Sequence, residues 1–118
     1  MKNLFICYPK CTTCQKARKW LEENKVDFAE RHIVEKNPNK TELKKWIKLS
    51  GLEVRKFFNT SGLKYKELKL KDKLASMSDE EKIELLSSDG MLVKRPLLIS
   101  DKLVLVGFKE SEWVEKLK

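Results

Sequence analysis

Apolar residues recur along the chain in two rhythms, one typical of strands and one typical of helices. The run at residues 4–7 is continuously apolar and predicts a buried strand. After a break, Ala17, Trp20 and Leu21 recur at helical spacing among charged residues, which predicts an amphipathic helix. Residues 26–34 alternate well enough to predict a second strand. A strand, a crossover helix and a strand form a βαβ unit, so we expect these two strands to be parallel.

The middle of the chain is predicted to be a run of short helices. Asn39 and Glu42 form a capping box at the start of one helix, which Gly51 ends. Ser78 and Glu81 form a second capping box and open a later helix. These signals predict several helical elements between the second strand and the next one.

The last part of the chain returns to strands. Residues 93–99 and 103–106 predict two strands joined by a link of hairpin length. Residues 110–117 predict a final helix. Its apolar side chains are expected to face inward: Trp113, Val114 and Leu117.

The order of elements predicts an α/β fold. A βαβ unit and a ββα unit form one mixed sheet, and the helices between them are an insert at about residues 39–90. We expect residues 1–118 to form a single domain, because 118 residues suffice for one hydrophobic core and no linker or repeat divides them.

Charge and composition restrict the function. The chain has 26 Lys and Arg against 18 Asp and Glu, a formal net charge of +8. Lysines interleaved with glutamates are typical of a solvated surface, and an anionic partner is the alternative. We expect no direct nucleic-acid binding, because no such motif is present. No apolar segment approaches the roughly 20 residues of a membrane span and no secretory signal is recognisable, so we expect a cytoplasmic protein with no membrane contact.

The candidate chemistry lies where the first strand meets the first helix. Cys11 falls at the mouth of that helix, and Cys14 lies about one turn into it. A helix N-terminus stabilises a thiolate, and Lys10 adds positive charge nearby. The spacing lets Cys14 close a disulfide with Cys11, so we expect Cys11 to attack and Cys14 to resolve the mixed disulfide. The adjacent Lys10, Thr12 and Thr13 are expected to contact the substrate.

Two other interpretations of the cysteines stay open. One is that they are packing residues, which fits Cys7 within the first strand. The other is a metal site, because the spacing of Cys7, Cys11 and Cys14 matches that of iron–sulfur enzymes that use S-adenosylmethionine. Those enzymes need a large barrel, and a zinc site would need His32 as fourth ligand. We expect no metal and no bound cofactor.

Arg95 and Pro96 are expected to form the second half of the site. The topology brings the start of the third strand beside the first strand-to-helix turn, so both residues should lie near Cys11. The Arg95 guanidinium would favour the Cys11 thiolate, and the Arg95–Pro96 bond is a candidate cis bond. The alternative is that Pro96 blunts a strand and Arg95 is solvated.

Together these features resemble the ArsC/Spx family of thioredoxin-like proteins. The resemblance rests on the strand–Cys-x-x-Cys–helix start, the inserted helices, Arg95-Pro96 and the turn at Gly107. The family includes glutathione- and glutaredoxin-linked arsenate reductases and Spx-type redox regulators of RNA polymerase. The resemblance implies a thioredoxin-like fold with a helical insert, with Cys11 as the nucleophile and Arg95 near a bound oxyanion.

The sequence also departs from the arsenate reductases of that family. Residues 12–15 follow the nucleophile as Thr-Thr-Cys-Gln, which is closer to the Spx type. Asn59 and Gly107 stand where the enzymes supply further arginines. Losing two guanidinium groups weakens the binding of a multiply charged oxyanion, so we expect little or no arsenate reduction.

Three functions follow as hypotheses. The first is a thiol–disulfide oxidoreductase, with glutathione as a co-substrate or with glutaredoxin or thioredoxin as partner. The second is a redox-sensing regulator that binds RNA polymerase α. The third is a glutathione-linked arsenate reductase. A monomer is expected in each case.

Overall fold

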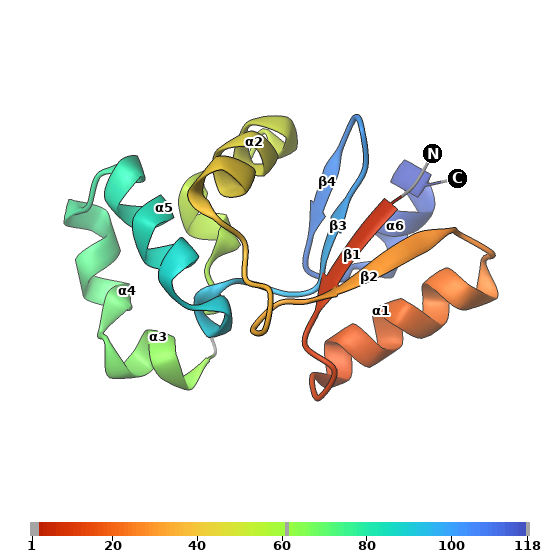
Figure 1. Ribbon diagram of the computed structural model, residues 1–118, viewed down its shortest axis with the longest axis horizontal. Coiled ribbons are helices and arrows are strands. Elements are labelled where there is room, and N and C mark those ends of the chain that lie inside the picture. Colours follow the sequence, from red (N-terminus) through yellow and green to blue (C-terminus); the bar gives the residue numbers. More distant parts are fainter. Residues whose placement is uncertain (1–2, 61, 118) are drawn as a thin grey trace.

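A four-stranded sheet lies at the centre of the molecule, with helices beside it and beyond one end of it (Figure 1). The computed structural model describes residues 3–60 and 62–117, so the stretch ahead of the first strand, residues 1 and 2, lies outside the described part. The strands, in chain order, are β1 (Asn3–Cys7), β2 (Phe28–His32), β3 (Leu97–Ile99) and β4 (Val104–Val106).

The sheet is mixed, as predicted, with the order β2-β1-β3-β4. β1 and β2 are parallel, which confirms the βαβ unit. β3 runs antiparallel to both β1 and β4, and the link of hairpin length joins β3 to β4. The α/β fold with a βαβ–ββα sheet is therefore confirmed.

Helices follow β1, β2 and β4, as the pattern predicts. In the residues that the structure describes, the insert between β2 and β3 contains four α-helices and three short 3₁₀ turns, η1 to η3. The helices are α1 (Thr12–Glu23), α2 (Lys40–Ser50), α3 (Leu63–Glu67), α4 (Leu70–Lys73), α5 (Asp79–Ser88) and α6 (Glu110–Leu117). The 3₁₀ turns are η1 (Val54–Phe57), η2 (Leu74–Ser76) and η3 (Gly90–Leu92). Within the described ranges, no helix combines the length and the apolar character that crossing a bilayer requires.

Both predicted capping boxes are present. The Asn39 side chain accepts a hydrogen bond from the Glu42 amide at 2.8 Å, and the Glu42 carboxylate accepts one from the Asn39 amide. The Ser78 hydroxyl and Glu81 make the same reciprocal pair at the start of α5. Gly51 ends α2 in the left-handed conformation with φ of 71°. These local signals therefore fix where α2 and α5 begin.

The third strand starts later than predicted. Residues 93–99 were expected to be strand, but β3 begins at Leu97. The Lys94 amide donates to the Phe57 carbonyl at 2.7 Å, so this segment pairs with η1 instead of the sheet. Pro96 has no amide to donate, and the Arg95–Pro96 bond is cis, as expected.

The last helix is oriented by one tryptophan. Trp113 is fully buried, but Val114 is 42 % exposed, so the prediction that Val114 faces inward is wrong. The Trp113 indole packs edge-on against Trp20 of α1 with a centroid distance of 5.9 Å and donates to the Gly107 carbonyl. An eight-residue helix buries a single stripe, and the large indole determines which stripe that is.

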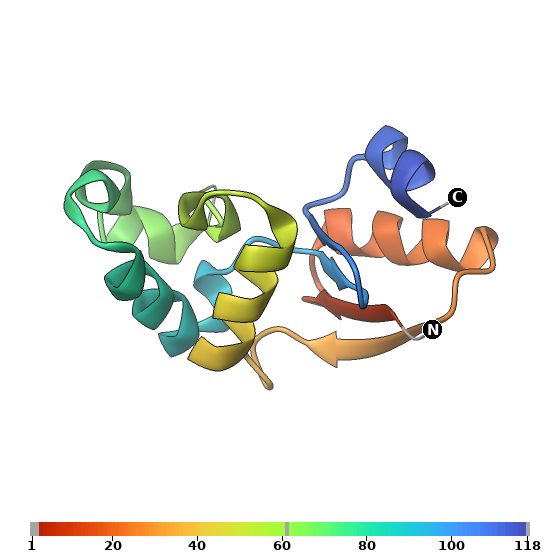
Figure 2. The same ribbon diagram turned by 90° about the horizontal axis from the view of Figure 1, so that it is seen from above.

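The side chains of β1 divide the core into two clusters, one on each face of the sheet. Phe5 and Cys7 pack with α1 and α6, whereas Leu4 and Ile6 pack with the helical insert. Figure 2 shows α1 and α6 on one side of the sheet and the insert gathered beyond the strands. The period of two along β1 thus connects both halves of the molecule through one strand.

Arg31 in β2 fastens the first helix of the insert to the sheet. Its guanidinium forms a two-pronged ion pair with the Glu42 carboxylate, with N–O distances of 2.6 and 2.8 Å. It also donates to the Lys36 carbonyl and lies over the Trp46 ring, 5.8 Å from the centroid. These hydrogen bonds from Arg31 hold the pKa of Glu42 below its ordinary value.

Gly90 brings the far end of the insert against the end of β2. A Cβ atom added there would overlap the Ile33 carbonyl oxygen and lie 2.7 Å from its carbonyl carbon. Both obstacles are backbone atoms, which cannot rotate away. Only glycine fits this contact without moving the insert relative to the sheet.

We expect Gly90→Ala to lower the free energy of unfolding by about 3 kcal/mol or more, because the new methyl group must displace backbone. Urea unfolding followed by circular dichroism measures this change. Gly51→Ala is the matched control, since a Cβ at Gly51 meets nothing within 4 Å and only the positive φ is unfavourable. Gly51→Ala should lower the free energy of unfolding by only about 1–2 kcal/mol. Equal losses in the two variants would contradict the proposed close contact.

The Arg31–Glu42 pair predicts a pH-dependent part of the stability. Because the pKa of Glu42 is lowered in the folded state, its stabilisation is complete above the ordinary carboxyl pKa and is lost as the pH falls through the folded pKa. Glu42→Gln should therefore lower the free energy of unfolding by about 1–2 kcal/mol at pH 7, and by progressively less below about pH 4.

Urea unfolding at several pH values tests this expectation. Glu84→Gln serves as the control because the Glu84 side chain, 3.6 Å from Lys40, is 67 % exposed. Its cost should stay below about 0.5 kcal/mol at every pH. A Glu42→Gln cost that does not change with pH would show that the ion pair contributes nothing to the titration.

Candidate functional site

The three cysteines lie at different depths around the start of α1. Cys11 is the N-cap residue of α1 and is partly exposed. Cys14 is 2 % exposed and Cys7, at the end of β1, is 3 % exposed. All three are free thiols in this structure. Cys11 is thus the one that a partner molecule can reach directly.

Hydrogen bonds hold the turn that carries Cys11. The Cys11 amide donates to the Tyr8 carbonyl at 2.9 Å, and the Gln15 side chain donates to the Pro9 carbonyl at 3.0 Å. The Gln15 amide then donates to the Cys11 carbonyl, which begins the helix. The Cys11 side chain caps no helix amide, so its sulfur is not engaged by the helix start.

Cys14 lies beneath Cys11 and touches both other thiols. Its sulfur accepts a hydrogen bond from the Tyr8 amide at 3.4 Å. The hydrogen bond with Cys7 and then burial raise the pKa of Cys14, whereas the same hydrogen bond lowers the pKa of Cys7. A hydrogen bond with Cys11 lowers the pKa of Cys14, but by less than the other two effects raise it. Cys14 is therefore a protonated thiol at neutral pH, within reach of Cys11.

A pocket of about 340 Å³ opens beside the Cys11 thiol. Of the residues predicted for the site, Cys11, Thr13 and Arg95 line this pocket. Pro96 is buried, and Lys10 and Thr12 are exposed and do not belong to its lining. The structure thus places Arg95 in the same pocket as Cys11. Lys10 and Thr12 do not line this pocket.

Arg95 has hydrogen-bond donors that the rest of the described chain does not use. Its guanidinium stacks on the Tyr8 ring, 5.1 Å from the centroid. The Nε and Nη1 atoms are buried, and no acceptor within residues 3–60 and 62–117 bonds to them. Buried donors are nearly always paired, and a guanidinium pairs best with a carboxylate or another oxyanion. The pocket therefore suits an anionic group.

Several residues of the pocket were not predicted as binding residues. They are Asn59, Gly62, Lys94, Val106, Gly107, Phe108 and Lys109. Asn59 and Gly107 were noted as the positions of missing arginines, and both do lie here. Lys94 precedes Arg95 and Lys109 follows Gly107 by two residues, but nothing in the sequence distinguishes these two lysines from the many others. The two lysines supply positive charge where the arginines are absent.

His32 has a structural role in this arrangement. Its Nδ1 accepts hydrogen bonds from the Val34 and Glu35 amides, both at 3.1 Å, and its ring packs edge-on against Tyr8. In the part of the chain that the structure describes, no group of three or more His, Cys, Asp or Glu side chains is arranged to hold a metal ion. Within the described residues, His32 therefore does not join the three cysteines as a metal ligand.

Comparison with known sequences identifies relatives over nearly the whole chain. A sequence model of the ArsC family matches residues 7–116. The uncharacterized protein YusI of Bacillus subtilis (strain 168) is 56 % identical, covering 98 % of each chain. The regulatory protein MgsR of the same organism is 31 % identical, covering 97 % of this chain and 89 % of MgsR. The global transcriptional regulator Spx of Enterococcus faecalis is 32 % identical, covering 88 % of this chain and 77 % of Spx.

Solved structures show the same fold. A crystal structure of an ArsC family related protein from Bacteroides fragilis superimposes with a TM-score of 0.96, at 61 % identity and with complete coverage of both chains. An arsenate reductase from Vibrio cholerae superimposes with a TM-score of 0.86, at 25 % identity, covering 98 % of this chain and 97 % of the enzyme. The fold is therefore shared with an ArsC family related protein and with an arsenate reductase.

The difference in depth predicts which thiol reacts first. Iodoacetamide should alkylate Cys11 at least about tenfold faster than Cys7 or Cys14, because the buried thiols become accessible only when the chain opens locally. Mass spectrometry of tryptic peptides after short labelling measures the three rates. In urea the three rates should become similar, which is the control. Faster labelling of Cys14 in the folded protein would contradict the assignment.

Proposed function

The chain belongs to the ArsC family, and on that basis we propose that it is a thiol–disulfide redox protein in which Cys11 attacks and Cys14 resolves. One observation carries the proposal. A single accessible thiol, Cys11, lies above a buried protonated thiol, Cys14, and borders a pocket that is also lined by Arg95, whose buried Nε and Nη1 donors are unpaired in the described chain.

The reaction proceeds in two exchanges. The Cys11 thiolate attacks one sulfur of a substrate disulfide, the substrate S–S bond breaks, and the other substrate sulfur leaves as a thiolate that takes up a proton. Cys14 then loses its proton and attacks the Cys11 sulfur, which releases the second substrate thiol and forms the Cys11–Cys14 disulfide. The substrate gains two electrons and two protons, and the protein loses them.

Arg95 has two tasks in this proposal. Its positive charge attracts an anionic substrate toward the pocket beside Cys11. Its guanidinium, which lines the pocket and has two donors without a partner in the described chain, pairs with a carboxylate or another anionic group of the substrate. A substrate held in this way places its sulfur beside Cys11.

A thiol donor closes the cycle. Glutathione as a co-substrate, or glutaredoxin or thioredoxin as a partner, would attack the Cys11–Cys14 disulfide and return both cysteines to thiols. Glutathione has two carboxylates, which suits the cationic pocket made by Lys94, Arg95 and Lys109.

A redox-sensing regulator is the second candidate. The observation that favours it is the similarity to MgsR and Spx, whose names describe regulators and which match most of this chain. In that case the Cys11–Cys14 bond would change a surface that contacts RNA polymerase α. Arsenate reduction is the third candidate, and Asn59 and Gly107 count against it because neither provides a guanidinium for the oxyanion.

Trapping the mixed disulfide tests the proposal. Cys14→Ser stops the second exchange, so a disulfide between Cys11 and the substrate should accumulate and be identified by mass spectrometry. In the unchanged protein, mild oxidation should give a Cys11–Cys14 bond with Cys7 free. Cys7→Ser is the control and should still form the Cys11–Cys14 bond. A predominant Cys7–Cys14 bond, or no adduct on Cys11, would overturn the proposal.

Further assays separate the three candidates. Multiple turnovers of a disulfide substrate with glutathione or thioredoxin support the oxidoreductase. Binding of RNA polymerase α that changes on oxidation supports the regulator. Efficient arsenate-dependent oxidation of NADPH, coupled through glutathione and glutaredoxin, would place the third candidate first.

A further inference from the structure

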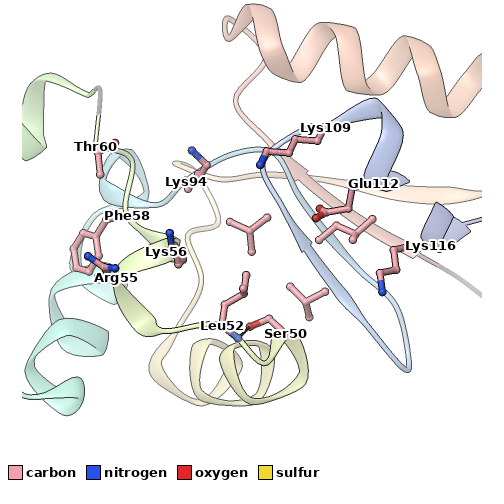
Figure 3. Close-up of a pocket in the computed structure, with 13 residues that line it drawn as sticks. Ser50, Leu52, Arg55, Lys56, Phe58, Thr60, Lys94, Lys109, Glu112 and Lys116 are labelled. Atoms are coloured by element: carbon pink, nitrogen blue, oxygen red, sulfur yellow. Dashed lines mark hydrogen bonds between the residues drawn. The ribbon is translucent and has the colours of Figure 1, made fainter. Parts of the chain in front are cut away.

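A cationic groove lies next to the Cys11 pocket, between the helical insert and the β3–β4 hairpin. It has a volume of about 510 Å³, and its lining comes from the end of α2, the η1 region, β4 and α6. Figure 3 shows basic side chains from both sides of this groove. These basic residues are Arg55, Lys56, Lys94, Lys109 and Lys116.

The charge of the groove differs from that of the whole surface. The chain as a whole has 26 basic and 18 acidic residues, whereas the groove has five basic residues against one carboxylate, Glu112. Arg55 is neutralised in part by Glu53, at 2.7 Å. The four lysines form no ion pair within residues 3–60 and 62–117. A concave surface with unpaired charge of one sign concentrates the field and attracts anions.

The floor of the groove is apolar. Leu52, which is 43 % exposed, and the three residues of β4 contribute to it, together with Phe58. A free ion or a small anion would use the lysines but not this floor. A peptide that combines acidic and apolar side chains would use both.

The groove leads into the Cys11 pocket. Lys94, Val106 and Lys109 line both cavities, so the two are adjacent along β4 and the turn after it. A chain that lies in the groove would therefore continue to the accessible thiol. The groove is separate from Cys11 itself, because neither Cys11 nor Arg95 belongs to its lining.

We propose that this groove docks an acidic, extended segment of a protein substrate and thereby delivers the neighbouring cysteine of that substrate to Cys11. The inference rests on the proposed function and names its substrate class: proteins whose reactive cysteine is flanked by Asp and Glu. Lysine ammonium groups attract carboxylates without requiring one fixed geometry, so the groove selects charge rather than a unique sequence.

Three synthetic peptides test the proposal. Each contains one cysteine joined through a disulfide to thionitrobenzoate, and each has a flanking segment of four acidic, four uncharged polar or four basic residues. The protein variant is Cys14→Ser. Its Cys11 thiolate attacks the peptide sulfur, a Cys11–peptide disulfide forms, and thionitrobenzoate leaves as a coloured thiolate. The absorbance change gives the rate of this single exchange.

At low salt the acidic peptide should react at least about tenfold faster than the uncharged peptide, because charge attraction speeds association. The ratio of these two rates should fall toward one at about 1 M salt, where the Debye length is near 3 Å. Adding Lys56→Glu and Lys116→Glu, which change the groove but not the Cys11 pocket, should abolish the preference. The matched control adds Lys19→Glu and Lys73→Glu, which change the net charge equally on α1 and α4 and should keep the preference.

The outcomes distinguish the two proposals. Equal rates for the acidic and uncharged peptides at low salt, with one thionitrobenzoate released per protein, would overturn the groove and leave the redox function intact. A preference that the groove variants retain would also overturn it, because overall charge would then be the cause. Release from none of the peptides, or an adduct on Cys7, would overturn the redox function itself.

Discussion

The backbone contact between Gly90 and Ile33 is the constraint on which the rest of the site depends. The helical insert leaves the sheet after β2 and returns to it before β3, so its two ends must meet, and this contact is where they do. Directly after it, the Lys94 amide donates to the Phe57 carbonyl and the chain passes into Arg95. The position of the cationic side of the pocket is therefore set by a contact that leaves no room for a Cβ atom.

Local signals account for most of what the sequence predicted about the fold. The first strand, the helix after Cys11 and the two capping boxes were predicted because hydrogen bonds and periodicity within a few residues determine them. The start of β3 and the orientation of Val114 were predicted wrongly. Both depend on distant partners: η1 takes the amide of Lys94, and Trp113 selects the buried stripe of α6. Such contacts leave no periodic pattern in the sequence.

The same distinction applies to the site. Cys11 and Cys14 could be found because their spacing and their place after a strand imply chemistry. Lys94 and Lys109 could not, because lysines occur throughout a chain with 26 basic residues, and only the fold gathers these two into one cavity. The unpaired donors of Arg95 were also invisible, since they depend on how the guanidinium is buried against Tyr8.

The arrangement separates reactivity from recognition. The reactive thiols lie around one turn at the start of α1 and differ in burial. Cys11 is accessible, whereas Cys14 is buried beneath it and stays protonated because its hydrogen bond with Cys7 and its burial raise its pKa. Cys7 fits the sequence interpretation as a packing residue, yet its hydrogen bond with Cys14 also raises the pKa of Cys14 and so keeps the resolving thiol protonated. The cations come from other segments, in η1, before β3 and in α6. Because the two sets share no residue, substitutions in the groove can change the choice of substrate while the order of the thiols stays the same.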